Sequence, residues 1–259
     1  MTEVAIPVVP IETKRVLSML VHGPAKAGKS TLTSTVPLPA IILDAEGSWN
    51  FIDEAGFKSG RRLRKKEWAP LEEEMPAYDG TWDVLHVKVT SWQIMTMCYQ
   101  ALLQYEHSFR SIILDSITEV QRRCKKNIRS GTTQMQTQHW GQLLDQMDDI
   151  IRGMRDLTLL ENTICCVVFV SETHVDKKGR DAPYMQGQIS NTMPYWVDIC
   201  GYFEVEVQLS DDGESNRKVR ILTIGPDPGK VTGERVAGRV PDIIEEPNVA
   251  AMMAAIHPR

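Results

Sequence analysis

Eight consecutive residues near the start of the chain have the pattern G-x-x-x-x-G-K-[ST], which forms a loop that binds phosphate groups. They are Gly23, Pro24, Ala25, Lys26, Ala27, Gly28, Lys29 and Ser30, and Thr31 follows them. Glycines allow a tight turn, so that successive backbone N–H groups point into one concavity before a helix. Lys29 would reach the β- and γ-phosphates, and the Ser30 hydroxyl would bind Mg²⁺. The pattern therefore predicts a site for ATP and Mg²⁺.

The residues that flank this loop favour the same interpretation. An apolar run at 16–21 predicts a strand that leads into the loop, and a helix is expected to follow it as far as Pro37. A strand before the loop and a helix after it are the context in which this pattern binds phosphates, whereas a chance glycine-rich loop would not need them. Binding of a nucleoside triphosphate is therefore the first prediction.

Two acidic residues follow apolar runs and would lie near the phosphates. They are Asp115 and Glu46. The carboxyl ends of parallel strands meet at one edge of a sheet, where α/β proteins bind their ligands. We expect Asp115 to hold Mg²⁺ together with Ser30. Hydrolysis also needs a group that orients or deprotonates water. Because Ser116 follows Asp115 where a second acidic residue could stand, Glu46 is the candidate; the alternative is an ordinary carboxylate at a strand end.

The hydrophobic pattern alternates between strands and helices, which predicts a mostly parallel central sheet flanked by helices. Strands are expected within 16–21, 39–47, 82–89, 109–114, 163–170, 197–209 and 219–224, and helices within 91–107, 117–128, 140–161 and 250–256. The run 163–170 is the most apolar and should be central. A hairpin turn at 211–213 would make the last two strands an antiparallel extension of the sheet edge. The segment 175–190 is expected to be a long loop.

The composition is that of an ordinary globular protein. The chain has 259 residues, of which 42% are hydrophobic and 24% charged, enough for a substantial core. We expect one domain at 14–259, preceded by an arm at 1–13 that is either a frayed end or docks on a neighbouring subunit. The charged stretch 59–79 is expected to be a solvated surface insertion, with a phosphate-contacting patch as the alternative.

Cysteine spacing, net charge and the N-terminus limit the class of protein. Five scattered cysteines lack the spacing of a zinc site and predict buried free thiols in a reducing cytoplasm. We expect neither a signal peptide nor a membrane span, because no segment has the required apolar pattern. The formal net charge of −5 does not favour nucleic-acid binding, although a local basic stripe would be enough for it.

Taken together, these motifs resemble the RecA-type recombinase ATPases. In that family the catalytic Glu lies on the strand after the phosphate-loop helix, in a similar apolar–Asp–Ala–Glu context, which here is Asp44-Ala45-Glu46. The metal-site strand ends in Asp-Ser, which here is Asp115-Ser116. The order of elements from 16 to 209 also follows the RecA core. The resemblance implies a RecA-like P-loop NTPase fold and ATP hydrolysis, with Glu46 and Lys29 as catalytic residues.

The resemblance also implies a residue that senses the γ-phosphate, at the end of the strand that follows the long helix. That position falls within 171–174, where the Gln usual in the family is absent. His174 is the candidate and Glu172 the second choice; the alternative for His174 is a partly exposed loop histidine. Adenine contacts would come from Trp49, Asn50 or Phe51, for which core packing is the favoured alternative.

Two loops would bind single-stranded DNA by the same resemblance, at 129–138 and at 176–190. In the second loop, Lys177, Lys178 and Arg180 would contact phosphates. Tyr184 would stack on a base. Lysine clusters in loops are more often simply solvated, so the family resemblance carries most of this expectation.

A narrower resemblance is to phage-encoded RecA-like ATPases, which include the Sak-type single-strand annealing proteins. It rests on the short core, on His174 and on the ending 233–241. It implies a host bacterial cytoplasm, single-stranded DNA as partner, head-to-tail self-association into a filament or ring, and a single-strand DNA-binding protein as a further partner. ATP lies between subunits in RecA-type filaments, so Lys230 and Arg235 would act in trans; the alternative for both is an ordinary surface charge.

Three functions fit this sequence. The leading hypothesis is a DNA-stimulated ATPase that assembles on single-stranded DNA and promotes recombination or annealing. The second is an ATP-switched assembly or partner-binding module, which the acidic net charge favours. The third is a hexameric helicase core or its loader, since fold alone does not decide among activities.

Overall fold

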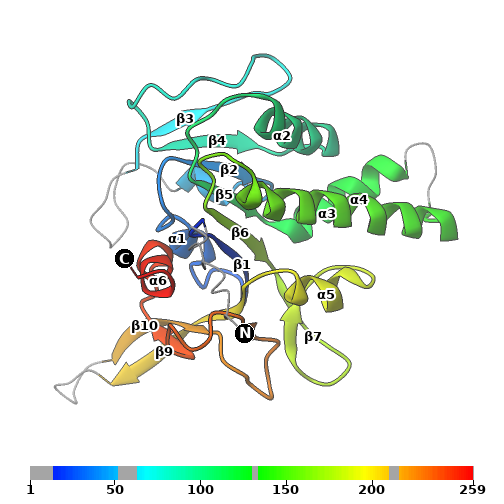
Figure 1. Cartoon of the computed structure of the whole chain (residues 1–259). Coiled ribbons are helices and arrows are strands. Elements are labelled where there is room, and N and C mark those ends of the chain that lie inside the picture. The colour runs from blue at the N-terminus through cyan, green and yellow to red at the C-terminus, as the bar shows by residue number, and fades with distance from the viewer. Residues whose placement is uncertain (1–13, 52–62, 130–133, 210–215, 259) are drawn as a thin grey trace, which may run out of the picture.

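The computed structural model describes residues 14–51, 63–129, 134–209 and 216–258 (Figure 1). The strands are β1 (Leu17–His22), β2 (Ala40–Asp44), β3 (Lys65–Glu67), β4 (Val84–Lys88), β5 (Ser111–Asp115), β6 (Cys166–Ser171), β7 (Thr173–Val175), β8 (Asp181–Pro183), β9 (Ile199–Leu209), β10 (Asn216–Thr223), β11 (Gly233–Glu234) and β12 (Ile243–Glu245). The helices are α1 (Lys29–Thr33), α2 (Trp92–Gln104), α3 (Ile117–Ile128), α4 (Thr137–Asp156), α5 (Ile189–Thr192) and α6 (Val249–Ile256). Short 3-10 turns lie at Ser48–Phe51, Leu157–Leu159 and Met193–Tyr195.

One large sheet organises the described part of the chain. Its strand order is β12-β10-β9-β1-β6-β5-β2-β4-β3, and β11 pairs with β9. The strands from β9 to β3 are parallel, whereas β10 and β12 add an antiparallel edge. The predicted fold class, a mostly parallel α/β sheet of the P-loop NTPase type with an antiparallel edge, is confirmed.

Helices cover both faces of the sheet and enclose two apolar cores (Figure 1). Helices α2, α3 and α4 pack on one face, with Met95, Val120 and Met147 in that core. Helices α1 and α6 pack on the other face, with Leu32 and Met252. Because both faces are covered, central strands are apolar along their whole length, as parallel strands usually are. All six residues of β6 are buried, and this strand is central as predicted.

Local sequence signals explain where the helices next to the site begin. The Ser91 hydroxyl accepts a hydrogen bond from the Ile94 N–H at 3.3 Å and caps α2. The Ser116 hydroxyl accepts from the Glu119 N–H at 3.3 Å and caps α3. Ser116 comes directly after β5, so this cap fixes how α3 leaves the sheet beside Asp115.

Two expectations about irregular segments were wrong. The expected long loop at 175–190 contains part of an antiparallel hairpin, β7–β8, and the helix α5. Its hydrogen-bond ladder joins Thr173 to Pro183, a pairing too short to give a periodic sequence signal. Within the charged stretch 59–79, Lys65–Glu67 forms the parallel edge strand β3 beside β4. The arm 1–13 and the turn 211–213 lie outside the described residues.

Candidate nucleotide-binding site

A pocket of about 490 Å³ lies at the carboxyl ends of β1, β2, β5 and β6. We call it the nucleotide pocket. Its lining residues are Gly23, Ala25, Lys26, Gly28, Lys29, Ser30, Glu46, Ser48, Asp115, Glu172 and Thr173. The parallel order of the four strands brings these separate segments together, because their carboxyl ends lie at the same edge of the sheet.

The phosphate loop has a backbone that requires glycine at two positions. Gly28 has φ +101°, in the region that favours glycine. Gly23 lies against β9, and a Cβ there would stand 2.0 Å from the Phe203 carbonyl oxygen. Lys29 closes the loop, since its Nζ donates to the carbonyl oxygens of Gly23 and Pro24 at 2.9 Å each. Burial lowers the pKa of Lys29, although the nearby carboxylates of Asp115, Glu46 and Glu172 act in the opposite direction.

Asp115 sits at the centre of a group of hydrogen-bond donors. Its Oδ2 accepts from the Ser30 hydroxyl at 2.6 Å, from the Ser48 hydroxyl at 2.9 Å and from the Trp49 indole N–H at 3.1 Å. The residue is almost fully buried, and this burial raises the pKa of Asp115 despite the three bonds. Trp49, a candidate for adenine contact, is a core residue whose polar end binds this carboxylate.

The donor set beside Asp115 fits a magnesium ion. Mg²⁺ prefers oxygen ligands and is usually bound through one or two protein groups, with phosphate oxygens and water as the others. The Ser30 hydroxyl and the Asp115 carboxylate supply two such oxygens next to the phosphate loop. Within the described ranges no group of three or more His, Cys, Asp or Glu side chains could hold a metal by itself. Ser30 and Asp115 are thus the residues that would hold Mg²⁺ with a bound nucleotide.

Glu46 enters the nucleotide pocket from the loop after β2. Its Oε1 accepts a hydrogen bond from the Ser116 hydroxyl, which ties it to the start of α3. Partial desolvation raises the pKa of Glu46, and repulsion from Asp115 and Glu172 adds to this rise. A carboxylate with a raised pKa is a better proton acceptor, which suits a group that activates water.

Glu172 and Thr173 occupy the pocket wall where the γ-phosphate sensor was expected. The Arg122 guanidinium donates to both carboxylate oxygens of Glu172, at 2.8 and 3.0 Å. The Thr173 hydroxyl donates to the Ala182 carbonyl at 3.1 Å and lies 3.2 Å from the Nδ1 of His22. Sequence reasoning did not select Thr173; its one signal was its place two residues after the buried strand β6.

His174 lies outside the nucleotide pocket. It lines a neighbouring cleft of about 690 Å³, beside the β7–β8 hairpin, which we call the hairpin cleft. Its ring packs on Tyr184, with ring centroids 5.1 Å apart. Strand β6 ends at Ser171 and β7 starts two residues later, so the chain has already turned away from the phosphate loop at His174.

The hairpin cleft also holds most of the residues expected to bind DNA or to act in trans. Lys178, Arg180, Lys230 and Arg235 line it. Arg180 pairs with Asp176 at 2.9 Å, and Lys230 pairs with Glu204 at 2.5 Å. Arg235 donates to the Tyr195 carbonyl oxygen. Lys177 and Lys178 are exposed in the turn of the hairpin, whereas Tyr184 is half-buried. Residues 130–133 of the other expected DNA loop lie outside the described residues.

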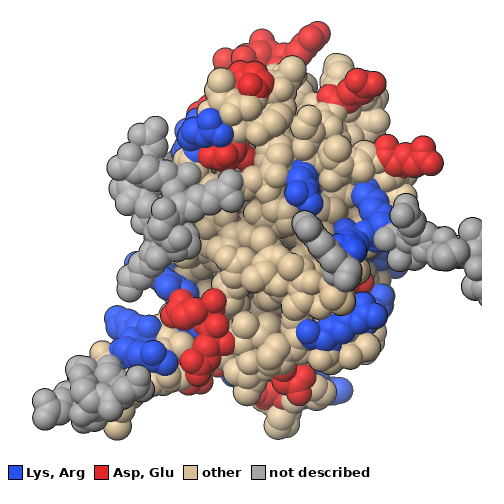
Figure 2. Space-filling view, turned by 60° about the vertical axis from the view of Figure 1, so that its left-hand side comes forward, with Lys and Arg blue, Asp and Glu red and all other residues tan. Residues whose placement is uncertain are grey.

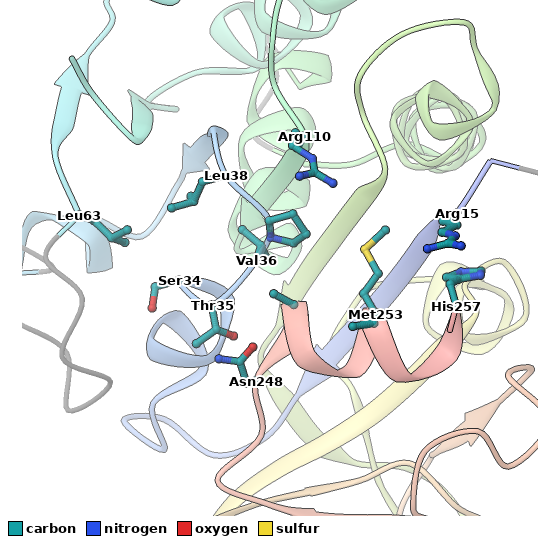
Figure 3. Close-up of a pocket in the computed structure, with 13 residues that line it drawn as sticks. Arg15, Ser34, Thr35, Val36, Leu38, Leu63, Arg110, Asn248, Met253 and His257 are labelled. Carbon is teal, nitrogen blue, oxygen red and sulfur yellow. The ribbon is translucent and has the colours of Figure 1, made fainter. Parts of the chain in front are cut away.

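A third hollow lies at the opposite end of the sheet (Figure 3). This groove of about 660 Å³ is formed near the amino ends of β1 and β5, where Arg15 and Arg110 precede the two strands, and along α6. Its described lining contains no carboxylate. Since ligands of parallel α/β sheets bind at the carboxyl ends of strands, the nucleotide pocket is the candidate site.

The charges on one face of the molecule are distributed in small groups. Figure 2 shows a largely uncharged middle, with several Lys and Arg side chains near one another on its right-hand side and with Lys and Arg beside Asp and Glu at the lower left. None of the helices in the described ranges is sufficiently long and apolar to span a bilayer.

Comparison with known proteins agrees with the geometry of the pocket. The family model for an AAA domain (AAA_24) matches residues 15–236, which include the phosphate loop, Glu46 and Asp115. No curated protein matches the chain. Because the family match covers most of the sequence and contains every residue that lines the nucleotide pocket, the chain belongs to the AAA domain family of P-loop ATPases.

Proposed function

We propose that this protein hydrolyses ATP and that single-stranded DNA stimulates the turnover, in the manner of a RecA-like recombination or annealing ATPase. The observation that carries the hydrolysis is the meeting of Lys29, Ser30, Glu46 and Asp115 in one pocket. These residues supply a cation for the phosphates, oxygens for a metal ion and a base for water, which are the groups that phosphoryl transfer to water requires.

The chain's own residues have separate tasks in this reaction. The phosphate loop holds the β- and γ-phosphates through its backbone N–H groups, and Lys29 moves from the Gly23 and Pro24 carbonyls to the phosphate oxygens. Bound Mg²⁺ neutralises charge that builds on those oxygens. Glu46 orients a water molecule in line with the γ-phosphate and accepts its proton. Ser116 holds the Glu46 carboxylate in place.

The coupling to DNA is supported by the position of the β7–β8 hairpin. Thr173 lines the nucleotide pocket and is also the first residue of β7. Lys177 and Lys178 are exposed five residues or fewer beyond it, so a nucleic-acid backbone bound there would be connected to the γ-phosphate wall by a short rigid segment. A filament or ring would repeat this hairpin along the strand.

One observation favours the alternative, an ATP-switched module that binds a partner other than DNA. Arg180 and Lys230 are both neutralised by carboxylates of the same chain, which leaves fewer cations for phosphates. A role of Lys230 or Arg235 in trans would likewise need its contacts within this chain to break.

The test is the ATPase rate of the purified protein with and without single-stranded DNA, with electron-microscope images of the same samples. We expect turnover that depends on Mg²⁺ and rises with DNA, together with ordered assemblies. Lys29→Ala is the control for contaminating ATPases. Turnover that DNA does not change would support the switched module, and absence of turnover in the wild-type protein would refute hydrolysis.

A further inference from the structure

A fully buried histidine lies behind the loop that carries Glu46. His86 is on β4, beside β2, and is 0% exposed. Its Nε2 lies 3.0 Å from the Asp44 Oδ2, and its Nδ1 lies 2.8 Å from the Glu67 Oε1. With a carboxylate oxygen at each ring nitrogen, the arrangement is satisfied when both nitrogens donate. A buried polar side chain with two such partners fixes the position of both.

The Asp44 carboxylate, which His86 contacts, also holds the loop after β2 through hydrogen bonds. Its Oδ1 accepts from the backbone N–H groups of Glu46 at 3.2 Å and Gly47 at 2.7 Å. Its Oδ2 accepts from the Trp49 N–H at 3.1 Å. Burial acts to raise the pKa of Asp44, but the hydrogen bond from His86 and those from the Gly47 and Trp49 N–H groups lower it below its ordinary value. The carboxylate therefore holds the whole turn from Glu46 to Trp49 in one conformation.

Side chains of the same turn contribute both to the activation of water and to the magnesium site of the proposed reaction. Glu46 faces the pocket as the candidate base, while Ser48 and Trp49 hold Asp115 at the metal side. A small shift of this turn would displace the base and the metal ligand together. Lys29 and the loop amides belong to another segment, which runs from the end of β1 to the first residues of α1 and touches the turn where the Ser30 hydroxyl donates to the Ser48 hydroxyl at 3.1 Å. The groups that bind phosphate should therefore be displaced less than Glu46 and Asp115.

On the other side of His86, the contacts extend to the protein surface at strand β3. Glu67 is opposite His86 in the β3–β4 register, and its side chain is about half exposed. Lys65, on the same strand, donates to the Trp49 carbonyl oxygen at 3.3 Å. The edge strand β3 thus holds the turn through two routes, one through His86 and Asp44 and one through Lys65.

We propose that His86 is a positioning residue for hydrolysis, acting through Asp44 on Glu46 and Asp115. This inference rests on the proposed ATPase activity for its kinetic readout. Removing His86 should lower kcat and leave ATP binding nearly unchanged, because the turn moves more than the phosphate loop does. A displacement of catalytic groups by about 1 Å can cost about 100-fold in rate.

The experiment compares His86→Leu with His86→Gln in the full chain. Leu removes both polar contacts, whereas the amide of Gln can still donate to Asp44. We expect His86→Leu to lower kcat by about 10- to 100-fold with a change in KM below about threefold, and His86→Gln to recover most of the rate. His107→Leu is the matched control, since His107 is a partly buried histidine at the other end of α2. Glu67→Gln, at a half-exposed position, should lower kcat in the same direction without a risk to folding.

Amide hydrogen exchange provides a second readout that does not need turnover. In His86→Leu the N–H groups of Gly47 and Trp49 should exchange faster, while a peptide from α4 stays as in the wild type. Unchanged exchange in the turn, an unchanged kcat in a folded variant, or an equal loss of ATP affinity would each overturn the proposal. A wild-type protein that binds ATP without hydrolysing it would instead refute the proposed function, and the exchange result would still decide the role of His86.

Discussion

The nucleotide pocket and the hairpin cleft lie side by side, but their cations are held differently. Lys29 is bound by two carbonyl oxygens at 2.9 Å, and within the described residues it has no carboxylate at ion-pair distance. Arg180 and Lys230 in the cleft each have a carboxylate of the same chain, at 2.9 and 2.5 Å. A cation that is hydrogen-bonded only to neutral carbonyl groups can pair with an anionic ligand directly. A cation in an ion pair must first break that pair before it can bind the ligand.

This difference separates the two functions that the chain is proposed to have. In the pocket, the three residues proposed to act on ATP and Mg²⁺, Ser30, Asp115 and Glu46, line one cavity without a bound ligand. Of the cations that line the cleft, Lys178 is exposed, Arg180 and Lys230 pair with carboxylates, and Arg235 donates to a backbone carbonyl oxygen. We infer that ATP binding is intrinsic to the chain and that DNA binding depends more on salt, on assembly or on a partner.

The largest effect is expected from Lys29→Ala. Loss of this cation removes the charge that the pocket keeps for the phosphates and the two bonds that close the loop. ATP turnover should fall by about 1,000-fold or more, as expected for a lost transition-state contact. The matched control is Lys178→Ala in the cleft, assayed without DNA, which should keep the wild-type rate. Comparable losses in both variants would remove the distinction between the two regions.

The next largest effect is expected from Glu46→Gln. The amide cannot accept a proton, so hydrolysis should slow by about 100- to 10,000-fold, while ATP affinity stays within a few-fold. Single-turnover rates and nucleotide titration measure the two quantities separately. Glu106→Gln, on the exposed segment after α2, is the control. Turnover like that of the wild type would exclude Glu46 as the base.

A pH profile tests the same carboxylate without mutation. Because desolvation raises the pKa of Glu46, its proton-accepting form is lost at a higher pH than for an ordinary glutamate. As pH falls, kcat should therefore begin to decrease above the usual range for Glu, and the decrease should disappear in Glu46→Gln. A profile that is flat down to the ordinary value would place the base elsewhere.

The residues of the nucleotide pocket were accessible to sequence reasoning because each lies next to a buried strand. Ser30 is the last residue of the phosphate-loop pattern, whereas Asp115 ends an apolar strand and Glu46 follows another by two residues, and a parallel sheet brings such strand ends together. Thr173 and His174 show the limit of this reasoning. The family resemblance predicted a γ-phosphate sensor within 171–174, but only the end of β6 and the pairing of β7 determine which of these side chains lines the nucleotide pocket.

His86 illustrates a second limit. Its partners come from two other strands. One of these strands, β3, lies in the charged stretch 59–79, which was predicted to be a solvated surface insertion. A single histidine in an alternating strand pattern gives no signal that its two ring nitrogens contact two carboxylates. The ion pairs of the cleft are similar, because Lys230 and Glu204 meet only through the packing of their segments.

A moderate effect on stability is expected from His22, which lies between the two regions. Its Nε2 is 2.8 Å from the Val231 carbonyl oxygen in the wall of the cleft, and its Nδ1 is 3.2 Å from the Thr173 hydroxyl in the wall of the pocket. Burial lowers the pKa of His22 from 6.5 to about 4. Between these values the unfolded chain binds a proton that the folded chain does not, so the free energy of unfolding decreases as pH falls.

The decrease from this histidine amounts to at most about 3 to 4 kcal/mol and is complete only below about pH 4. Urea unfolding of the wild type and of His22→Gln, at pH 7 and at pH 4.5, measures it as the difference between the two pH dependences. Gln keeps a donor for the Val231 carbonyl and does not titrate. If the free energy of unfolding has the same pH dependence in the wild type and in His22→Gln, the two regions are not joined by a buried neutral histidine.

The smallest effect is expected in the cleft and tests its proposed partner. Each cation that contacts a phosphate of single-stranded DNA adds about 0.7 to the slope of log K against log salt. Lys177→Ala with Lys178→Ala should lower that slope by about 1.4, if both lysines contact the backbone. Adding Arg180→Ala should change it little, because Asp176 already neutralises Arg180. A further decrease of the slope with Arg180→Ala would show that DNA displaces Asp176 from Arg180. The paired cations of the cleft would then contact phosphates only after DNA has broken their ion pairs. An unchanged slope in both the double and the triple variant would mean that DNA, if it binds, contacts another surface.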